Sequence, residues 1–166
     1  LKGLCKKETR MPQSLSQLYI HSIFSTKNRV RSIAYPQLRE SLNAYAAGIL
    51  NNMGCQVVLV GAVIDHMHVL FRLNRSCSVA DAVGALKKRT SVWIKEQMPD
   101  TKDPFLMKFA WQTGYSAFSV SSSRVDDVRS YIARQDEHHR QHSFQDEYLE
   151  FLRKHGVAYD EKYVWD

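Results

Sequence analysis

The chain has 166 residues, of which 44% are hydrophobic, and its formal net charge is +6. This size and apolar content fit one compact domain, predicted over residues 11–166, with residues 1–10 interpreted as a disordered leader or non-native sequence. No apolar stretch reaches the roughly eighteen uncharged residues that a membrane span needs, and no secretion signal is recognisable. The three cysteines show no C-x-x-C spacing, which argues against a disulfide framework or zinc knuckle and predicts a cytoplasmic protein.

In chain order, alternation and helical periodicity predict four strands, two helices among them, and two further helices at the end. The first half should contain a strand at 18–24, a helix at 35–53 ended by Gly54, and two antiparallel strands that a turn near Asp65 makes from residues 57–73. A helix from Ser78 to about Gln97, closed by Met98-Pro99, and irregular chain at 104–112 should follow. The last elements should be a strand at 115–120 and two helices, from 123 to about 138 and from Ser143 to Gly156. Capping boxes that begin at Ser78, Ser123 and Ser143 mark the starts of the last three helices.

This order is βαββαβ followed by two helices. It is the ferredoxin-like split βαβ plan of α+β proteins, in which helices cover one face of an antiparallel sheet, here with C-terminal helices added. Because that fold supports many unrelated activities, the function has to be argued from particular side chains.

Two histidines, His66 and His68, lie one residue apart in apolar sequence that is typical of a strand. Side chains at i and i+2 leave the same face of a strand, so both imidazoles point together and can hold one metal ion. The alternative is that both rings lie at a strand end and bond to water or backbone. For the adjacent Asp65 we expect a turn role, with orientation of an imidazole as the second option.

A tyrosine and a glutamine lie four residues apart in the helix predicted after the last strand. Tyr131 and Gln135 would therefore project from one helical face. Tyrosine, with a free pKa of about 10, is a poor nucleophile unless its target is activated, for example by a metal. The alternative is that Tyr131 packs in the core and Gln135 is solvated. His138, His139 and His142, which follow, are expected to be surface residues rather than a second metal site.

Basic residues occur in clusters, which favours a polyanionic partner. The clusters are Lys27, Arg29 and Arg31 after the first strand, then Lys87, Lys88 and Arg89, then Arg124, Arg129 and Arg134.

Three motifs taken together resemble the single-tyrosine HUH transposases. They are His66-Met67-His68 near the start of a strand, Trp111-x-x-Gly114-Tyr115, and Tyr131-x-x-x-Gln135 on a late helix. This family comprises small insertion-sequence transposases that act on single-stranded DNA, and the REP-associated tyrosine transposases. The resemblance extends from Met11 to Asp166 and includes the segment 24–29.

The resemblance implies that His66, His68 and Gln135 hold a divalent metal, Mg²⁺ or Mn²⁺, and that Tyr131 is the nucleophile. Tyr131 would attack the scissile phosphate, keep the 5′-phosphate and release a 3′-hydroxyl, so that cut ends can be rejoined without ATP. Among the two ions, imidazole ligands suit Mn²⁺ better. Met67 is expected to face the core on the other side of the strand.

The implied protein is a transposase or endonuclease that acts on hairpin-containing single-stranded DNA, as a homodimer, in the prokaryotic cytoplasm near the nucleoid. We expect the clusters at 27–31 and 87–89 to bind DNA, and Trp93, Trp111, Tyr115 or Phe118 to be candidates for stacking on bases, with Trp93 fitting the core better. Two alternatives stay open: a domesticated REP-associated relative that acts on chromosomal repeats, and a non-catalytic nucleic-acid-binding module.

Overall fold

The computed structural model describes residues 15–97, 103–138, 143–160, 162, 164 and 165. At its centre is a four-stranded antiparallel sheet in the order β2-β3-β1-β4. The strands are β1 (Tyr19–Ser25), β2 (Gln56–Ala62), β3 (His66–Arg72) and β4 (Ser116–Val120). The predicted α+β class and the division of the long apolar run into two strands at Asp65 are therefore confirmed.

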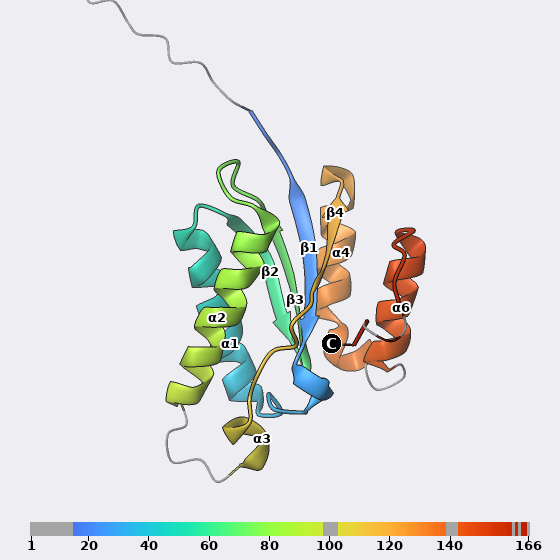
Figure 1. Ribbon diagram of the computed structural model, residues 1–166. Coiled ribbons are helices and arrows are strands. Elements are labelled where there is room, and N and C mark those ends of the chain that lie inside the picture. Colours follow the sequence, from blue (N-terminus) through green and yellow to red (C-terminus); the bar gives the residue numbers. More distant parts are fainter. Residues whose placement is uncertain (1–14, 98–102, 139–142, 161, 163, 166) are drawn as a thin grey trace, which may run out of the picture.

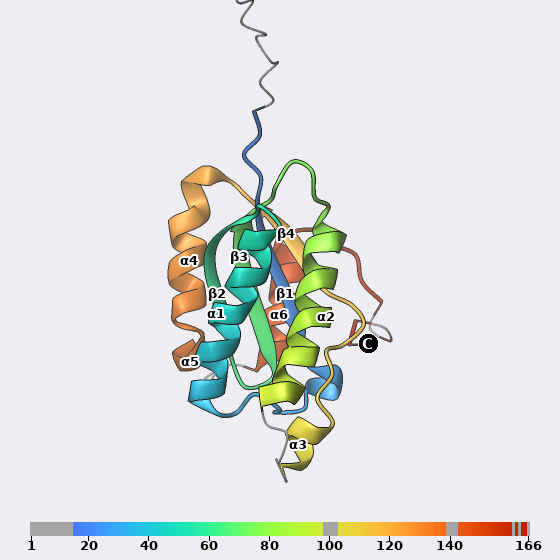
Figure 2. The same ribbon diagram turned by 90° about the vertical axis from the view of Figure 1, so that its left-hand side faces the viewer.

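Helices cover both faces of the sheet (Figures 1 and 2). The two helices of the split βαβ plan, α1 (Pro36–Asn52) and α2 (Val79–Gln97), lie on one face, and the C-terminal helices α4 (Val125–Ala133) and α6 (Phe144–Lys154) lie on the other. The shorter elements are η1 (Lys27–Arg29), α3 (Pro104–Met107), η2 (Ser122–Arg124) and α5 (Gln135–His138). Within the described residues, no helix has the length and hydropathy to cross a membrane.

Strand β3 is buried on both faces of the sheet: residues 66–71 have no exposed position among them. Met67, Val69 and Phe71 belong to the larger core beneath α1 and α2, as predicted for Met67. The alternate positions face the other way, towards a smaller core formed by α6 with side chains of β1 and β4. His66 and His68 thus occupy the inner surface between the sheet and the C-terminal helices.

Serine caps place two of the helices where the sequence predicts them. The Ser78 hydroxyl accepts from the Asp81 backbone N–H at 3.0 Å, and the Ser143 hydroxyl accepts from the Asp146 N–H at 3.2 Å. The third predicted box, at Ser123, is wrong. Ser123 lies inside η2, where its hydroxyl is 3.1 Å from the Ser121 hydroxyl, so it cannot cap the helix that follows.

The connection before β4 is also more ordered than predicted. The segment 104–112 contains the short helix α3, and Trp111 forms an isolated β-bridge with Thr26. The predicted leader 1–10 and the predicted helix end at Met98-Pro99 lie outside the described residues.

Helix α4 comes unusually close to the edge strand β2. A Cβ atom added at Gly61 would lie 2.6 Å from the Ile132 Cγ2 atom, closer than side-chain carbons approach one another. Glycine at this position therefore lets α4, which carries Tyr131, settle against the sheet.

Candidate metal and nucleophile site

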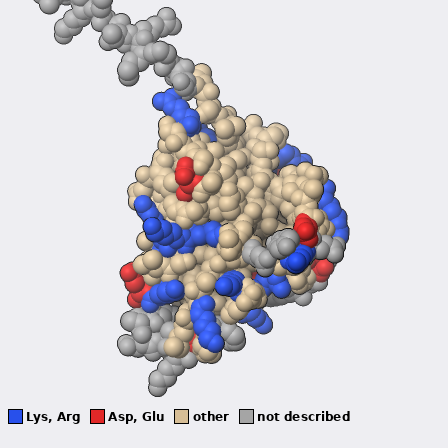
Figure 3. Space-filling view, in the orientation of Figure 1, with Lys and Arg blue, Asp and Glu red and all other residues tan. Residues whose placement is uncertain are grey.

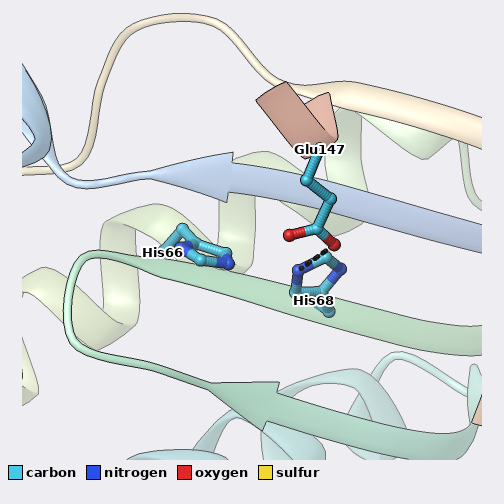
Figure 4. Close-up of side chains that lie close together, drawn as sticks. All are labelled: His66, His68 and Glu147. Carbon is cyan, nitrogen blue, oxygen red and sulfur yellow. Dashed lines mark ion pairs between the residues drawn. The ribbon is translucent and has the colours of Figure 1, made fainter. Parts of the chain in front are cut away.

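The paired histidines lie side by side at the start of β3 (Figure 4). Neither His66 nor His68 has any solvent exposure, and their ring centroids are 5.0 Å apart. The two rings share one face of the strand, as its alternation predicts. Their complete burial leaves little room for bulk water at this end of β3, and the groups that contact the two rings are side chains of the protein.

His66 is held on both sides by neighbouring groups. Its Nδ1 atom is 2.7 Å from Asp65 Oδ1, and its ring stacks on Phe144 at a centroid distance of 4.1 Å. Burial lowers the pKa of His66, and the Asp65 carboxylate opposes that shift. Asp65 therefore contacts an imidazole from the turn between β2 and β3, which fits both of the roles considered for it, and its backbone carbonyl accepts from the Thr26 N–H and so joins this turn to the chain after β1.

His68 contacts a third histidine that the sequence analysis did not single out. His21 Nε2 lies 3.0 Å from His68 Nδ1, and the two rings stack with centroids 5.2 Å apart. Burial lowers the pKa of His21 to about 3, with the charge of His155 as a smaller cause, so His21 is neutral at physiological pH.

A buried carboxyl group completes the cluster. Glu147, on α6, is 5% exposed, and its Oε1 atom lies 3.9 Å from His68 Nε2. One ligand atom from each of His66, His68 and Glu147 falls within 4.8 Å of the other two. Burial, and secondarily the charge of Glu150, raises the pKa of Glu147 to about 8. Figure 4 shows its carboxyl group directed at His68.

Gln135 joins this cluster through its side-chain amide. It is 2% exposed, and its Nε2 donates to Glu147 Oε1 at 2.9 Å. Its other amide atom, Oε1, is buried with no hydrogen-bond partner among the described residues. A buried carbonyl oxygen that lacks a donor is costly unless something binds it, and a divalent cation would do so.

Tyr131 lies next to the histidines. Its hydroxyl oxygen is buried, and its ring meets those of His68 and Phe151 edge-on at centroid distances of 6.0 and 5.5 Å. The continuous helix predicted to carry both Tyr131 and Gln135 is wrong, because α4 ends at Ala133 and Arg134 leaves helical geometry at φ −101°, ψ 10°. The break does not separate the two residues from the site: Gln135, at the start of α5, is buried rather than solvated.

The predicted DNA-binding residues differ in their surroundings. Lys27 and Arg31 are exposed in the loop after β1, which is hydrogen-bonded to the Asp65 turn beside His66. The Arg29 guanidinium lies 5.2 Å from the Trp165 ring centroid. Lys87 is half-buried and donates to the carbonyls of Thr113 and Gly114 at 2.8 and 2.9 Å, so it ties α2 to the chain before β4.

Lys88 and Arg89, in contrast, are exposed on α2. Figure 3 shows Lys and Arg side chains gathered over the lower half of its face, towards the end of the molecule where β1 runs into η1. Among the four aromatic side chains considered for stacking, Trp111 and Phe118 are buried, Trp93 packs on the core, and Tyr115 is 38% exposed. Of the three histidines considered and set aside as a second metal site, His138, His139 and His142, the last two lie outside the described residues.

Comparison with known proteins matches residues 14–135 to the family described as IS200-like transposases. The transposase for insertion sequence element IS200 of Salmonella typhimurium is 24% identical over 115 residues, which cover 69% of this chain and 74% of that protein. The ISDra2 transposase TnpA of Deinococcus radiodurans is 24% identical over 119 residues, covering 72% and 84%. Among solved structures, that of a candidate transposase from Deinococcus radiodurans R1 has a TM-score of 0.59 at 22% identity, over 76% of this chain and 96% of that one, which supports the fold alone.

Proposed function

This chain belongs to the IS200-like transposase family, and on that premise we propose that it cuts and rejoins single-stranded DNA through a 5′-phosphotyrosine intermediate. The observation that carries the proposal is the convergence of Tyr131, two imidazoles and an amide oxygen at one buried point between β3 and the C-terminal helices. The non-catalytic alternative gives no reason for burying so many polar groups together.

For the metal, the ligands that we propose are His66, His68 and Gln135, with the Glu147 carboxyl within reach of both imidazoles. The donor set fits a divalent ion, because it offers imidazole nitrogens together with amide and carboxyl oxygens. When bound, Mg²⁺ or Mn²⁺ would polarise the scissile phosphate and stabilise charge on the departing oxygen. We expect tighter binding of Mn²⁺, which tolerates imidazole better.

Tyr131 would supply the nucleophile. Its oxygen forms a bond to phosphorus as the bond from phosphorus to the 3′-oxygen breaks, and the proton that the phenol loses is balanced by the one that the 3′-hydroxyl gains. The phosphotyrosine ester has the same number of ester bonds as the phosphodiester that it replaces. A 3′-hydroxyl from another strand can therefore reverse the step and join DNA without ATP.

As substrate we propose single-stranded DNA with a hairpin next to the cut site, and as the acting form a homodimer in the prokaryotic cytoplasm. The loop of η1 gives the DNA a basic approach to the site, since it is hydrogen-bonded to the turn that carries Asp65. Tyr115 is the exposed candidate for stacking on an unpaired base.

The proposal is tested by incubating the protein with labelled hairpin oligonucleotides and Mn²⁺, then searching for a protein–DNA band that survives denaturation. We expect the band with single strands, and its loss when EDTA is added or when the same sequence is fully double-stranded. Binding of hairpins without an adduct, at any divalent ion tested, would contradict the proposal and favour a nucleic-acid-binding module.

The exposed basic residues of the loop should control the salt dependence of DNA binding. For the variant Lys27→Ala, Arg31→Ala we expect weaker binding to every sequence, and a slope of log K against log salt that is shallower by roughly 0.7 for each phosphate that the variant no longer neutralises. Lys87→Ala is the matched control: the sequence groups Lys87 with the basic cluster 87–89, but because its ammonium group donates to two carbonyls of the protein we now expect it to hold α2 in place rather than to bind a phosphate. Lys87→Ala should lower the melting temperature and leave the slope unchanged. A slope that changes in Lys87→Ala and not in the Lys27→Ala, Arg31→Ala variant would disprove DNA binding by the loop after β1.

A further inference from the structure

The two histidines of the site have a second feature in common: the nitrogen on the side away from the cluster is held by another residue. Nδ1 of His66 lies 2.7 Å from the Asp65 carboxylate, and Nδ1 of His68 lies 3.0 Å from Nε2 of His21. We propose that His21 is a positioning residue that fixes the tautomer of His68, so that the Nε2 lone pair of His68 is presented to the metal. The metal part of this inference rests on the proposed function.

The chemistry of a neutral imidazole leaves two arrangements for the contact between His21 and His68. Each ring carries one N–H donor and one acceptor nitrogen, so either His68 Nδ1–H donates to His21 or His21 Nε2–H donates to His68. In the first arrangement the Nε2 of His68 keeps a lone pair that can bind a metal. In the second arrangement that nitrogen carries a hydrogen and cannot be a ligand.

Two observations favour donation by His68. The first is the equivalent contact at His66, where a carboxylate can only accept and therefore places the hydrogen on Nδ1. The second is the 3.9 Å distance from His68 Nε2 to Glu147 Oε1, which is too long for a hydrogen bond that would draw a hydrogen to Nε2.

His21 is held firmly enough to act in this way. It is 1% exposed on the central strand β1, where it pairs with Leu70 of β3 and Phe118 of β4. Its ring also meets Phe151 of α6 edge-on at 5.4 Å between centroids. An acceptor fixed by two neighbouring strands and a covering helix defines one orientation for the His68 ring.

The difference between the two supporting residues has a physical reason. Asp65 lies in the turn with 19% of its side chain exposed, so its charge is partly solvated. His68 lies two residues further into the sheet, where Glu147 is already buried and a further carboxylate would add another charge at a high cost. A neutral imidazole supplies an acceptor there without adding a charge.

The competing explanation is that His21 only fills space among aromatic rings. Two substitutions separate the roles: His21→Phe keeps a ring and removes the acceptor, whereas His21→Gln loses the ring and keeps an acceptor at a similar reach. The control His155→Phe alters the same aromatic cluster, because His155 contacts Phe118 and Phe151, and it leaves the hydrogen bond between His21 and His68 in place.

Two measurements test the inference. Long-range ¹H–¹⁵N spectra of the metal-free protein report the tautomer of His68, and titration followed by electron paramagnetic resonance gives the Kd for Mn²⁺. We expect the Nδ1–H tautomer in the wild type and in His21→Gln, and loss of that single tautomer in His21→Phe. The Kd should rise by about 10- to 100-fold in His21→Phe, the usual effect of removing a residue that orients a ligand, and stay near wild type in the other two variants.

An Nε2–H tautomer of His68 in the wild type would overturn the inference, as would a His21→Phe protein that keeps both the tautomer and the Kd. If His21→Phe does not fold, the wild-type spectrum and the Kd of His21→Gln decide, since a space-filling role predicts that glutamine weakens binding. A wild type that binds no Mn²⁺ would instead refute the proposed metal function, and the spectra would still settle what His21 does to His68.

Discussion

Replacing Tyr131 with phenylalanine should abolish the covalent protein–DNA adduct and reduce strand cleavage by at least about 10³-fold, the scale of loss when a nucleophile is removed. The fold should survive, because phenylalanine keeps the edge-on ring contacts with His68, His21 and Phe151 and removes a hydroxyl alone. Mn²⁺ affinity should also be unchanged, since the proposed ligands are left intact. The adduct is measured on a denaturing gel with end-labelled DNA.

Tyr148→Phe is the matched control for this experiment. Tyr148 is buried on α6, and its hydroxyl is hydrogen-bonded to Ser116 of β4, so it is a second tyrosine close to the C-terminal core. We expect this variant to form the adduct. If the adduct persisted in Tyr131→Phe and disappeared in Tyr148→Phe, the nucleophile would be Tyr148 and the assignment of Tyr131 would be wrong.

Local sequence patterns predicted the fold well where one element decides its own geometry. The strand alternation around Asp65, the capping boxes at Ser78 and Ser143, and Gly54 with φ of 73° after α1 all depend on near neighbours in the chain. The failures are at Ser123 and Arg134. At these positions the chain leaves α-helical geometry, in η2 before α4 and at Arg134 after it, and helical periodicity does not report such a break.

The site, too, was predictable only where its geometry depends on residues that are neighbours in the chain. The common direction of His66 and His68 follows from the two-residue repeat of a strand. Glu147 and His21 reach the site only through the fold, because α6 and β1 are far from β3 in sequence. A signal for Glu147 was present: it lies on the helical face of Phe144, Tyr148 and Phe151, where a solvated carboxylate does not belong. The family match ends at Gln135, before α6 begins.

Removing the Glu147 carboxyl should stabilise the metal-free protein at high pH. An ordinary glutamate releases its proton near 4.5, but burial raises the pKa of Glu147 in the folded state to about 8. Between those two pKa values the folded state binds one proton more than the unfolded chain does. Each rise of one unit in the solution pH therefore lowers the free energy of unfolding by about 1.4 kcal/mol. The stability that the protonated Glu147 contributes is fully present below the pKa of the unfolded chain, and it is lost as the pH rises through the pKa of the folded state.

The variant for this test is Glu147→Gln, whose side-chain oxygen can still accept from Gln135 Nε2. Its free energy of unfolding in urea should exceed that of the wild type by a margin that grows from about pH 5 to about pH 8, reaching on the order of 4 kcal/mol. Comparing the two proteins at each pH cancels the buried histidines, whose lowered pKa values act in the opposite direction. The control Glu150→Gln removes an exposed carboxylate that pairs with Lys154 and is the smaller cause of the raised pKa of Glu147, so it should show only a small part of this dependence.

With Mn²⁺ bound, the wild type should become more stable than Glu147→Gln. A carboxyl that helps to hold a divalent ion must lose its proton, so wild-type affinity rises with pH while the affinity of Glu147→Gln stays lower and flatter. The same substitution would then stabilise the metal-free fold and weaken the metal-bound one. If Glu147→Gln instead bound Mn²⁺ as tightly as the wild type at pH 8, the carboxyl would serve only to orient Gln135, and His66, His68 and Gln135 would be the complete set of protein ligands.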